Sequence, residues 1–426
     1  MLPVSEDRPL RWIFLDLNSY FAAAEQANDP TLRGKPVAVG AVSSMTGTII
    51  AASYEAKAFG VKTGTKVGDA LKMCPDIVLK KATPGLYVHY HEQILEAVEN
   101  VLPVHKVCSI DEMKFRLLGE EMERENAIKL AHQLKQAIYD HVAPNLTCSV
   151  GIAPNSFLAK VGTEFEKPNG LVVIEAKDLP DKLFGKDLTF FPGINVRTKA
   201  RLQAAGCFDS TDLVKMPRQD VGRAFGSVIG ERWWYLLQGY DLEFDHNTGK
   251  SLGHSNVLAP EFRNDEGCRA ILLRLIHKAC ARLRASGFWA LRVDFFVSGQ
   301  GENWSAGFPL DPTQDTHAIM EKFFEAWPSR TFTKPIKVGV NFPHLKKSGT
   351  VTPSLFEVPR DTAHIGPAVD TINQKYGKNT IYLASIHRSK DEATEKIAFN
   401  KTWLFKEGKD DHVWMKKSDS EDPKNL

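Results

Sequence analysis

Three carboxylates lie where an unpaired charge would be unfavourable. Asp16 ends an otherwise apolar run, RWIFLDL at 11–17, and Asp111 and Glu112 are adjacent at a turn with hydrophobic flanks. If the two segments are neighbouring strands of one sheet, the three side chains meet at its rim, where they repel one another unless a divalent metal neutralises them. Two Mg²⁺ ions about 3.5–4 Å apart are one arrangement that needs such a cluster, and they serve in-line phosphoryl transfer. A single acid of this kind is more often a cap or a salt-bridge partner than a functional group.

The elements that would position these acids alternate between strands and helices up to about residue 176, as in an α/β or α+β unit. Strands are expected at 11–17, 34–41, 48–52, 147–153 and 170–174, a hairpin at 105–119, and helices at 19–27, 121–142 and 155–166. Between about 53 and 74, small and apolar residues recur at helical spacing, as in YEAKAF and KVGDALKMC. After the hairpin turn, Met113, Phe115 and Leu117 alternate with polar residues, which is the period of a strand.

Two further parts follow. Residues 180–240 have few strand signals and indicate a small helical domain, and the polar stretch 239–250 indicates a linker. Residues 251–345 predict the order β-α-β-β-α-β of the split ferredoxin-like pattern. Over 250–350 the chain has 14 Lys and Arg against 9 Asp and Glu, a local balance of +5. The first helix of this part has three basic residues at four-residue spacing, Arg274, Lys278 and Arg282. This spacing fits either a solvated face or a stripe that faces phosphates.

The composition is that of an ordinary globular protein with several domains. The chain has 426 residues, of which 43% are hydrophobic and 25% charged, and no apolar run approaches the roughly 20 residues of a membrane span. The start of the chain does not read as a secretory signal. Six scattered cysteines argue against a disulfide framework or structural zinc and favour a reducing cytosol. A net charge of +2 does not by itself indicate nucleic acid.

Four ordered motifs resemble those of the Y-family DNA polymerases, the translesion class, and the similarity extends over nearly the whole chain. The motifs are FLDLNSYFAAAEQ at 14–26, SYEAKAFGV at 53–61, CSIDEMKF at 108–115 and SVGIAPNSFLAKVGTEFEKPNGLVVI at 149–174. Each would be weak alone, but their order and spacing together are specific.

The resemblance implies a two-metal active site. Asp16, Asp111, Glu112 and the main-chain carbonyl of Leu17 would bind two Mg²⁺ ions, with Mn²⁺ as a substitute. The β- and γ-phosphates of a dNTP would be held by three side chains and three backbone amides, those of Tyr54, Lys57 and Lys167 and of Ser19, Tyr20 and Phe21. The ring of Phe21 would be the steric gate that rejects a 2′-hydroxyl. Taken outside the motifs, the same residues would be a core tyrosine, two solvated lysines and a core phenylalanine.

Two residues depart from the family pattern. Asn18 stands where many members have a second Asp, so it is not counted as a metal ligand. Lys57 replaces an Arg, which keeps the charge but loses the bidentate guanidinium and puts nucleotide affinity in doubt.

The resemblance also implies DNA and clamp contacts. Pro192-Gly193-Ile194 resembles the turn of a helix-hairpin-helix, in which the amides of Gly193 and Ile194 would face a DNA phosphate. Residues 251–345 resemble the little finger, with Arg274, Lys278 and Arg282 as candidate DNA contacts. Leu355 and Phe356 resemble a peptide that binds a sliding clamp, although Thr352 stands where Gln is usual. The segment after them is similar to the tail of bacterial error-prone polymerases.

The fold class expected from these features is α+β multidomain, a right-hand polymerase. The expected parts are a palm at 1–20 and 87–176, fingers at 21–86, a helical thumb at 177–240, a linker at 241–250, a little finger at 251–345, and a clamp-binding linker with a small tail domain at 346–426. The expected activity is template-directed DNA synthesis of low fidelity during DNA damage tolerance. The enzyme would be a nucleotidyltransferase whose substrates are primer-template DNA and dNTPs. It is expected to be bacterial, cytoplasmic and monomeric, with no membrane partner. The alternative is a non-catalytic polymerase-like subunit that binds DNA and the clamp. A nucleotide cyclase would share the metal site but not the thumb-like turn or the basic second part.

Overall fold

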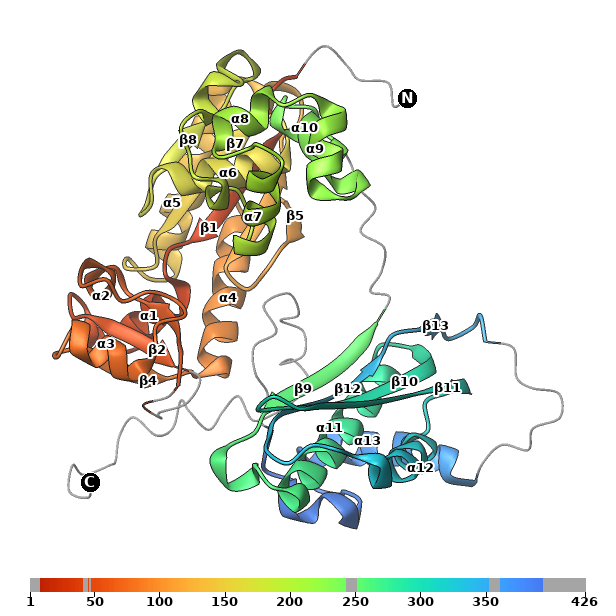
Figure 1. Cartoon of the computed structure of the whole chain (residues 1–426). Coiled ribbons are helices and arrows are strands. Elements are labelled where there is room, and N and C mark those ends of the chain that lie inside the picture. The colour runs from red at the N-terminus through yellow and green to blue at the C-terminus, as the bar shows by residue number, and fades with distance from the viewer. Residues whose placement is uncertain (1–7, 41–44, 46, 243–250, 352–360, 394–426) are drawn as a thin grey trace. The chain divides into compact units, whose positions relative to one another are not determined.

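The computed structural model describes residues 8–40, 45, 47–242, 251–351 and 361–393. These residues belong to two compact units, one containing the described residues up to 242 and the other those from 251 onward. Each unit has its own sheet and its own buried core. The predicted α+β multidomain class is confirmed (Figure 1).

The first unit begins with a strand–helix alternation and ends in helices. Its strands are β1 (Trp12–Leu17), β2 (Val37–Gly40), β3 (Ile49–Ala52), β4 (Val78–Lys81), β5 (Val104–Val107), β6 (Glu112–Arg116), β7 (Cys148–Ala153) and β8 (Leu171–Val173). Its helices are α1 (Tyr20–Asn28), α2 (Tyr54–Ala58), α3 (Val67–Met73), α4 (Pro84–Glu99), α5 (Arg124–His141), α6 (Ser156–Phe165), α7 (Val196–Ala204), α8 (Ser210–Lys215), α9 (Arg218–Phe225) and α10 (Val228–Leu237).

The central sheet of this unit has five strands in the order β5-β6-β1-β7-β8. β1 is its middle strand, and every residue of β1 is buried, which explains why its sequence is a continuous apolar run. The predicted hairpin is formed by β5 and β6, and β6 pairs antiparallel with β1. The two segments that carry the three acids are therefore adjacent strands.

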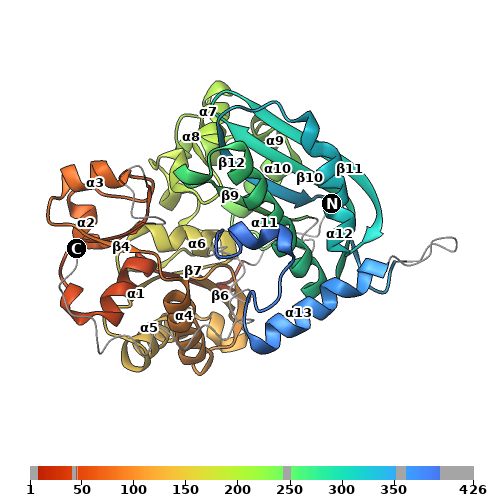
Figure 2. The ribbon, with the colours of Figure 1, turned by 90° about the horizontal axis from the view of Figure 1, so that it is seen from below.

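Helices cover both faces of this sheet. Figure 2 shows α4 and α5 on one side and α6 on the other. Because side chains alternate along β1, Ile13 and Leu15 share the face of their cross-strand partners Phe115 and Met113, while Asp16 lies on the opposite face with Glu112. That second face packs against α6.

Two glycines allow α6 to lie close to β7. A Cβ atom at Gly151 would lie 1.9 Å from the carbonyl oxygen of Ala159, and one at Gly162 would lie 3.1 Å from the Cα of Gly151. Asn155 caps the helix, accepting from the amide of Leu158 at 2.7 Å. Residues one and two turns along α6 are thereby fixed above the end of β1.

The segment between β1 and α4 forms a smaller layer with the three-stranded sheet β3-β2-β4. The helical spacing expected between about 53 and 74 is confirmed, and the chain forms two helices there, α2 and α3, with a turn between them. Gly60 and Gly64 in that turn have φ angles of +87° and +93°, which end the first helix. The helix α4 and the strand β4 were missed by the sequence analysis.

The second unit has the predicted β-α-β-β-α-β order. Its elements are β9 (Leu252–Val257), α11 (Asp265–Ala285), β10 (Phe288–Gly299), β11 (Asn303–Thr313), α12 (Thr316–Ala326), β12 (Pro335–Phe342), β13 (Leu345–Lys347) and α13 (Ile365–Tyr376). The sheet order is β11-β10-β12-β9, with β13 paired to β10. Alternate residues of the central strands, such as Val293, Phe295 and Val340, are buried with α11 and α12. The predicted start of α11 at Asn264 is confirmed, because its side chain accepts from the amide of Gly267.

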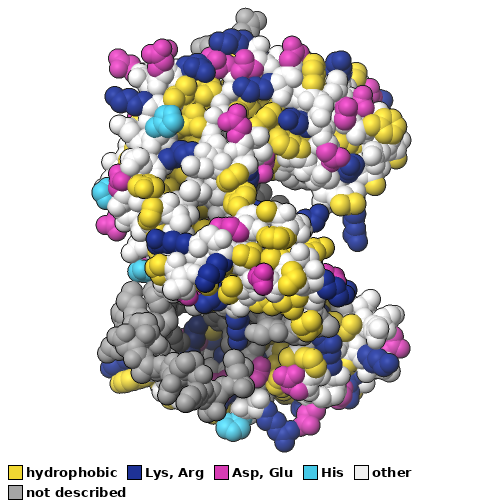
Figure 3. Space-filling model, turned by 90° about the vertical axis from the view of Figure 1, so that its left-hand side faces the viewer, with side chains coloured by type: hydrophobic (Ala, Val, Ile, Leu, Met, Phe, Trp, Pro, Cys, Tyr) yellow, Lys and Arg dark blue, Asp and Glu magenta, His cyan; other side chains and the backbone are white. Residues whose placement is uncertain are grey.

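Residues 361–393 pack onto this second unit. Arg284 on α11 forms a two-point ion pair with Asp370 on α13, and Ser389 donates to the carbonyl of Ala270 at 2.8 Å. Lys and Arg side chains are interspersed with Asp and Glu over the face drawn in Figure 3. Of the helices in the described ranges, none combines the length and apolar character needed to cross a bilayer.

Candidate active site

Asp16 and Glu112 are brought together by strand register. They are direct cross-strand partners on β1 and β6, and Asp16 is buried. Asp111 immediately precedes β6, where its main-chain carbonyl accepts the amide of Leu17 at 2.9 Å and its side chain accepts from the hydroxyl of Ser109. The three predicted acids thus lie around the end of β1.

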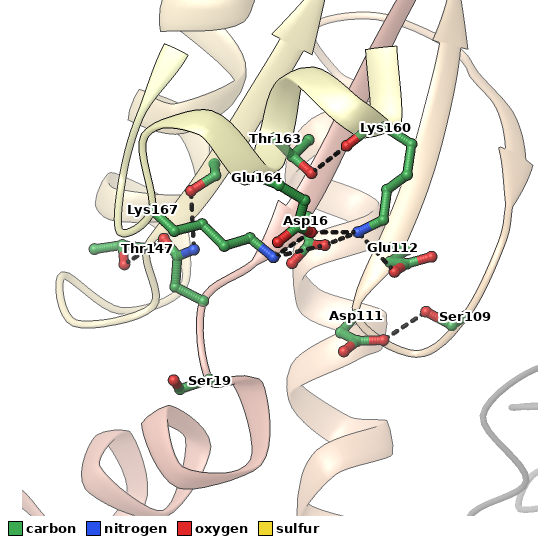
Figure 4. A network of polar contacts seen from close by, with 12 residues as sticks. Asp16, Ser19, Ser109, Asp111, Glu112, Thr147, Lys160, Thr163, Glu164 and Lys167 are labelled. Atoms are coloured by element: carbon green, nitrogen blue, oxygen red, sulfur yellow. Dashed lines mark hydrogen bonds and ion pairs between the residues drawn. The ribbon is translucent and has the colours of Figure 1, made fainter. Parts of the chain in front are cut away.

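Two lysine ammonium groups reach the same carboxylates (Figure 4). Lys160 on α6 contacts Asp16, and its Nζ lies 3.0 Å from Glu112 Oε1 and 3.2 Å from Glu164 Oε1. Lys167 Nζ lies 3.2 Å from Asp16 Oδ2 and 2.7 Å from Glu164 Oε1. Lys160 and Glu164 were missed by the sequence analysis, although they are one helical turn apart in the late motif that drew attention to Lys167.

The electrostatics of the acids reflect burial. Burial raises the pKa values of Asp111 and Glu112, and the neighbouring Asp16 adds to the effect at both; Ser109 opposes it at Asp111 and Lys160 opposes it at Glu112. Burial alone would lower the pKa of Lys160, but Asp16 and Glu112 outweigh burial and raise it. The site therefore favours added positive charge.

The donor set suits a hard divalent cation in kind, because carboxylate and main-chain carbonyl oxygens are the ligands that Mg²⁺ prefers. Within the described ranges, however, no three acidic, histidine or cysteine side chains are arranged to enclose a metal ion. Lys160 contacts both Asp16 and Glu112 instead. A metal at these oxygens would therefore meet the charge of this ammonium.

The candidate phosphate-binding residues lie beside the acids. Lys57 on α2 donates to Ser19 Oγ at 2.7 Å and lies 4.2 Å from the centroid of the Tyr54 ring. Burial lowers the pKa of Lys57, and the charge of Lys167 lowers it further, so the two lysines are near enough to repel. Ser19 is the N-cap of α1, and the amides of Tyr20 and Phe21 begin that helix. Two cations and a helix N-terminus meet here, as in an anion site.

Phe21 is buried on α1, and its ring stacks on that of Tyr87, with centroids 4.5 Å apart and an interplanar angle of 21°. Tyr87 is held in turn by donating to Glu25 Oε1 at 2.7 Å. One face of the Phe21 ring therefore packs against Tyr87 of α4.

Asn18 has a structural role in this chain. Its Oδ1 accepts from Thr147 Oγ1 at 3.1 Å and from the amide of Asn169 at 2.8 Å, and its Nδ2 donates to Ser149 Oγ at 3.0 Å. These bonds fasten the loop that follows Lys167 to the end of β1. That Asn18 is not a metal ligand stays a prediction.

The candidate DNA contacts are less open than the sequence suggests. Gly193 has a φ angle of +101°, as a tight turn requires, but Ile194 is buried and its amide donates to the carbonyl of Phe191 at 3.1 Å. Arg274, Lys278 and Arg282 are half-buried on α11, where Lys278 Nζ donates to the carbonyl of Ala393 at 2.7 Å. Leu355, Phe356 and Thr352 lie outside the described residues.

Comparisons with known proteins find relatives over most of the chain. Residues 15–164 match the impB/mucB/samB family, and residues 249–355 match the C-terminal domain of the same family. The DNA polymerase IV of Moorella thermoacetica is 30% identical over 384 residues, which are 87% of this chain and 95% of that protein. The DNA polymerase IV of Shewanella woodyi is 33% identical over 276 residues, 64% of this chain and 75% of that protein.

Two solved structures are similar in fold. A Y-family DNA polymerase chimera, Dbh-Dpo4(243-245)-Dbh, has a TM-score of 0.67 at 24% identity and covers 78% of this chain and 98% of its own. An insertion ternary complex of Dbh DNA polymerase has a TM-score of 0.55 at 23% identity and covers 79% and 99%.

Proposed function

This chain belongs to the Y-family of DNA polymerases, in the impB/mucB/samB group that includes DNA polymerase IV, and from that premise we propose that it copies damaged templates by two-metal phosphoryl transfer. It is a DNA-directed DNA polymerase. Beyond this activity, we propose its reaction mechanism, the residues that perform it, and the use of Mg²⁺ with primer-template DNA and dNTPs.

The pairing of Asp16 with Glu112 carries the proposal. Neighbouring strands present both carboxylates, with Asp111 beside them, on the face where Lys167 and Lys57 make an anion site. Asp16, Asp111, Glu112 and the carbonyl of Leu17 would hold the cations. When bound, Mg²⁺ would supply the positive charge that lowers the pKa of a primer 3′-hydroxyl and neutralises a triphosphate.

The remaining residues position the nucleotide. Lys167 and Lys57 bind phosphate oxygens as point charges, with Tyr54 and the amides at the start of α1 as hydrogen-bond donors. The ring of Phe21 occupies the space that a 2′-hydroxyl would need. Holding the triphosphate in line with the primer end converts binding energy into reactivity.

Primer extension on an undamaged template tests this mechanism. We expect the wild type to add nucleotides with Mg²⁺ and to stop when EDTA removes it, whereas Glu112→Gln should lose at least about 100-fold in rate, because metal-based charge stabilisation contributes several kcal/mol. Glu99→Gln, at an exposed position on α4, is the control with the same change of charge. Binding of primer-template should be measured for each variant by fluorescence anisotropy.

Two results would count against the mechanism. Equal activity of wild type and Glu112→Gln would remove Glu112 from the active site. Binding of primer-template without any extension by the wild type would favour a subunit that only binds DNA.

The parts of the chain have proposed roles on the same premise. We assign the palm to 1–20 and 87–176, the fingers to 21–86, the thumb to 177–240 and the little finger to 251–345, in a monomeric enzyme. Leu355 and Phe356 would contact a sliding clamp. Replacement of both by Ala should leave basal extension intact and abolish its stimulation by the clamp.

A further inference from the structure

We propose that Lys160 is a built-in counter-cation that competes with divalent metal for Asp16 and Glu112 and so sets the metal affinity of the substrate-free enzyme. The inference rests on the proposed function, because it takes these two carboxylates to be metal ligands. It assigns a role to a residue outside the predicted site.

The placement of Lys160 is specific and constrained. Its side chain is 15% exposed and that of Asp16 is 8% exposed, so each charge has little access to water. Its ammonium contacts Asp16, Glu112 and Glu164. The close approach of Gly151 to α6 and the cap at Asn155 prevent the helix from withdrawing. Lys160 therefore remains close to the carboxylates.

Competition follows from the oxygens involved. Lys160 contacts Oδ2 of Asp16 and Oε1 of Glu112, and a cation bound by both side chains would need oxygens of the same groups. An ammonium and a divalent cation repel each other strongly when both lie within about 4 Å of one carboxylate in a site of low dielectric. Metal binding must therefore displace the ammonium or accept its repulsion.

Glu164 gives the displaced ammonium an alternative partner. It lies one turn along α6 from Lys160, and its Oε1 already accepts from Lys160 at 3.2 Å. A small rotation of the lysine chain would keep this bond while releasing Asp16. Lys167 also contacts Asp16 Oδ2, at 3.2 Å, in the enzyme without nucleotide. Lys160 is the stronger candidate because it contacts both Asp16 and Glu112.

A purely structural role for Lys160 predicts the opposite result. If the ammonium only holds Asp16 and Glu112 at a spacing that suits the metal, its removal should weaken metal binding. The sign of the change in affinity therefore separates the two roles.

The test is Mn²⁺ binding to the full chain without DNA or nucleotide, measured from the electron paramagnetic resonance signal of free Mn²⁺. Lys160→Met keeps the length of the side chain and removes its charge, and we expect it to bind Mn²⁺ about 5- to 150-fold more tightly, the usual range for coupled ligands. Lys182→Met is the matched control. Lys182 lies in the same unit and pairs with Asp178 and the carbonyl of Val173, so its loss should not change the affinity.

A second variant acts in the other direction. Glu164→Gln removes the alternative partner and keeps Lys160 on Asp16, so Mn²⁺ should bind more weakly than to the wild type. In metal-free buffer, Lys160→Met should also have a lower melting temperature than the wild type. Added Mn²⁺ should raise the melting temperature of Lys160→Met more than that of the wild type.

The outcomes separate this inference from the proposed function. Unchanged or weaker Mn²⁺ binding by Lys160→Met, with a wild type that extends primers, overturns the competition and leaves the polymerase mechanism standing. If primer extension survives both the Glu112→Gln substitution and the removal of metal, the proposed function itself is overturned. Tighter binding by Lys160→Met together with weaker binding by Glu164→Gln supports the competition.

Discussion

The ring of Phe21 is held in one orientation by Tyr87, and this support makes it suitable for discrimination by shape. A ring fixed in position clashes with the 2′-hydroxyl of a ribonucleotide, whereas a mobile ring could move away from it. The 4.5 Å stack and the hydrogen bond from Tyr87 to Glu25 hold the ring on the side of α4.

Replacement of Phe21 by Ala should therefore open the site to ribonucleotides. We expect the ratio of kcat/KM for rNTP to that for dNTP to rise by about 10- to 200-fold, the range for one contact in an apolar pocket. Single-nucleotide insertion kinetics measure the ratio. Phe208→Ala, at an exposed position between α7 and α8, is the control and should behave as the wild type. An unchanged ratio in Phe21→Ala would show that another group excludes the 2′-hydroxyl.

Some residues of the site could be predicted from the sequence and others could not. A carboxylate that ends an apolar strand is energetically costly unless it has a partner, so Asp16 stood out. Lys160 and Glu164 belong to a helix whose charged residues would ordinarily face water, and only the packing of α6 onto β1 and β7 turns them inward. The role of Asn18 depends on the loop at Asn169, which lies far away in sequence.

Helix α6 depends on one side chain for both its start and its attachment. The amide group of Asn155 caps the helix and also donates to the carbonyls of Leu236 at 2.9 Å and Tyr240 at 3.0 Å, at the end of α10. The loss of Asn155 would therefore remove the cap and both of these bonds, although the carbonyl of Leu236 would keep the amide of Gly239 as a donor at 3.0 Å.

Asn155→Ala should lower the free energy of unfolding of the first unit by roughly 2–4 kcal/mol, from the loss of the cap and of the buried hydrogen bonds. Asn195→Ala is the matched change on α7, where the side chain accepts from the amide and hydroxyl of Thr198, and it should cost about 1 kcal/mol. Thermal unfolding followed by circular dichroism compares the two. Equal losses would mean that the bonds to α10 contribute nothing.

At the level of elements, periodicity predicted the strands around the site and the β-α-β-β-α-β order of the second unit. Between 53 and 74 the helical spacing is interrupted by a turn that contains Gly60 and Gly64, which separates α2 from α3. The helix α4 was missed although it supports Phe21, since its residues include aromatic and histidine side chains with weak helical preference.

The second unit contains a half-buried histidine that links its stability to pH. Burial, followed by the charges of Arg274, His317 and Arg284, lowers the pKa of His277 on α11 to about 4. Within the described part of the chain, its Nε2 atom is buried without a hydrogen-bond partner. Folded protein therefore keeps His277 neutral at pH values where the unfolded chain, with an ordinary pKa of about 6.5, binds a proton.

The stability contributed by neutral His277 should be present above about pH 6.5 and be lost progressively as the pH falls toward 4. At pH 5 the loss should be about 2 kcal/mol, since each unit of pKa corresponds to about 1.4 kcal/mol. The measurement is the melting temperature of the wild type and of His277→Gln at pH 7 and at pH 5. The melting temperature of His277→Gln should fall less between the two pH values than that of the wild type. His132→Gln, at an exposed position on α5, should keep the full decrease; identical behaviour of both variants would contradict the assignment.

Two of the residues that complete the core of the second unit lie beyond the segment 249–355 that matches the C-terminal domain of the family. Ile386 and Ala393 belong to the buried cluster formed by α11, α12 and the sheet, and Arg284 takes its carboxylate partner from α13. If 249–355 alone were transplanted into a related polymerase, it would arrive with a gap in its core and with Arg284 deprived of Asp370. The smallest piece of this chain that recombination could move intact between polymerases therefore extends at least to residue 393.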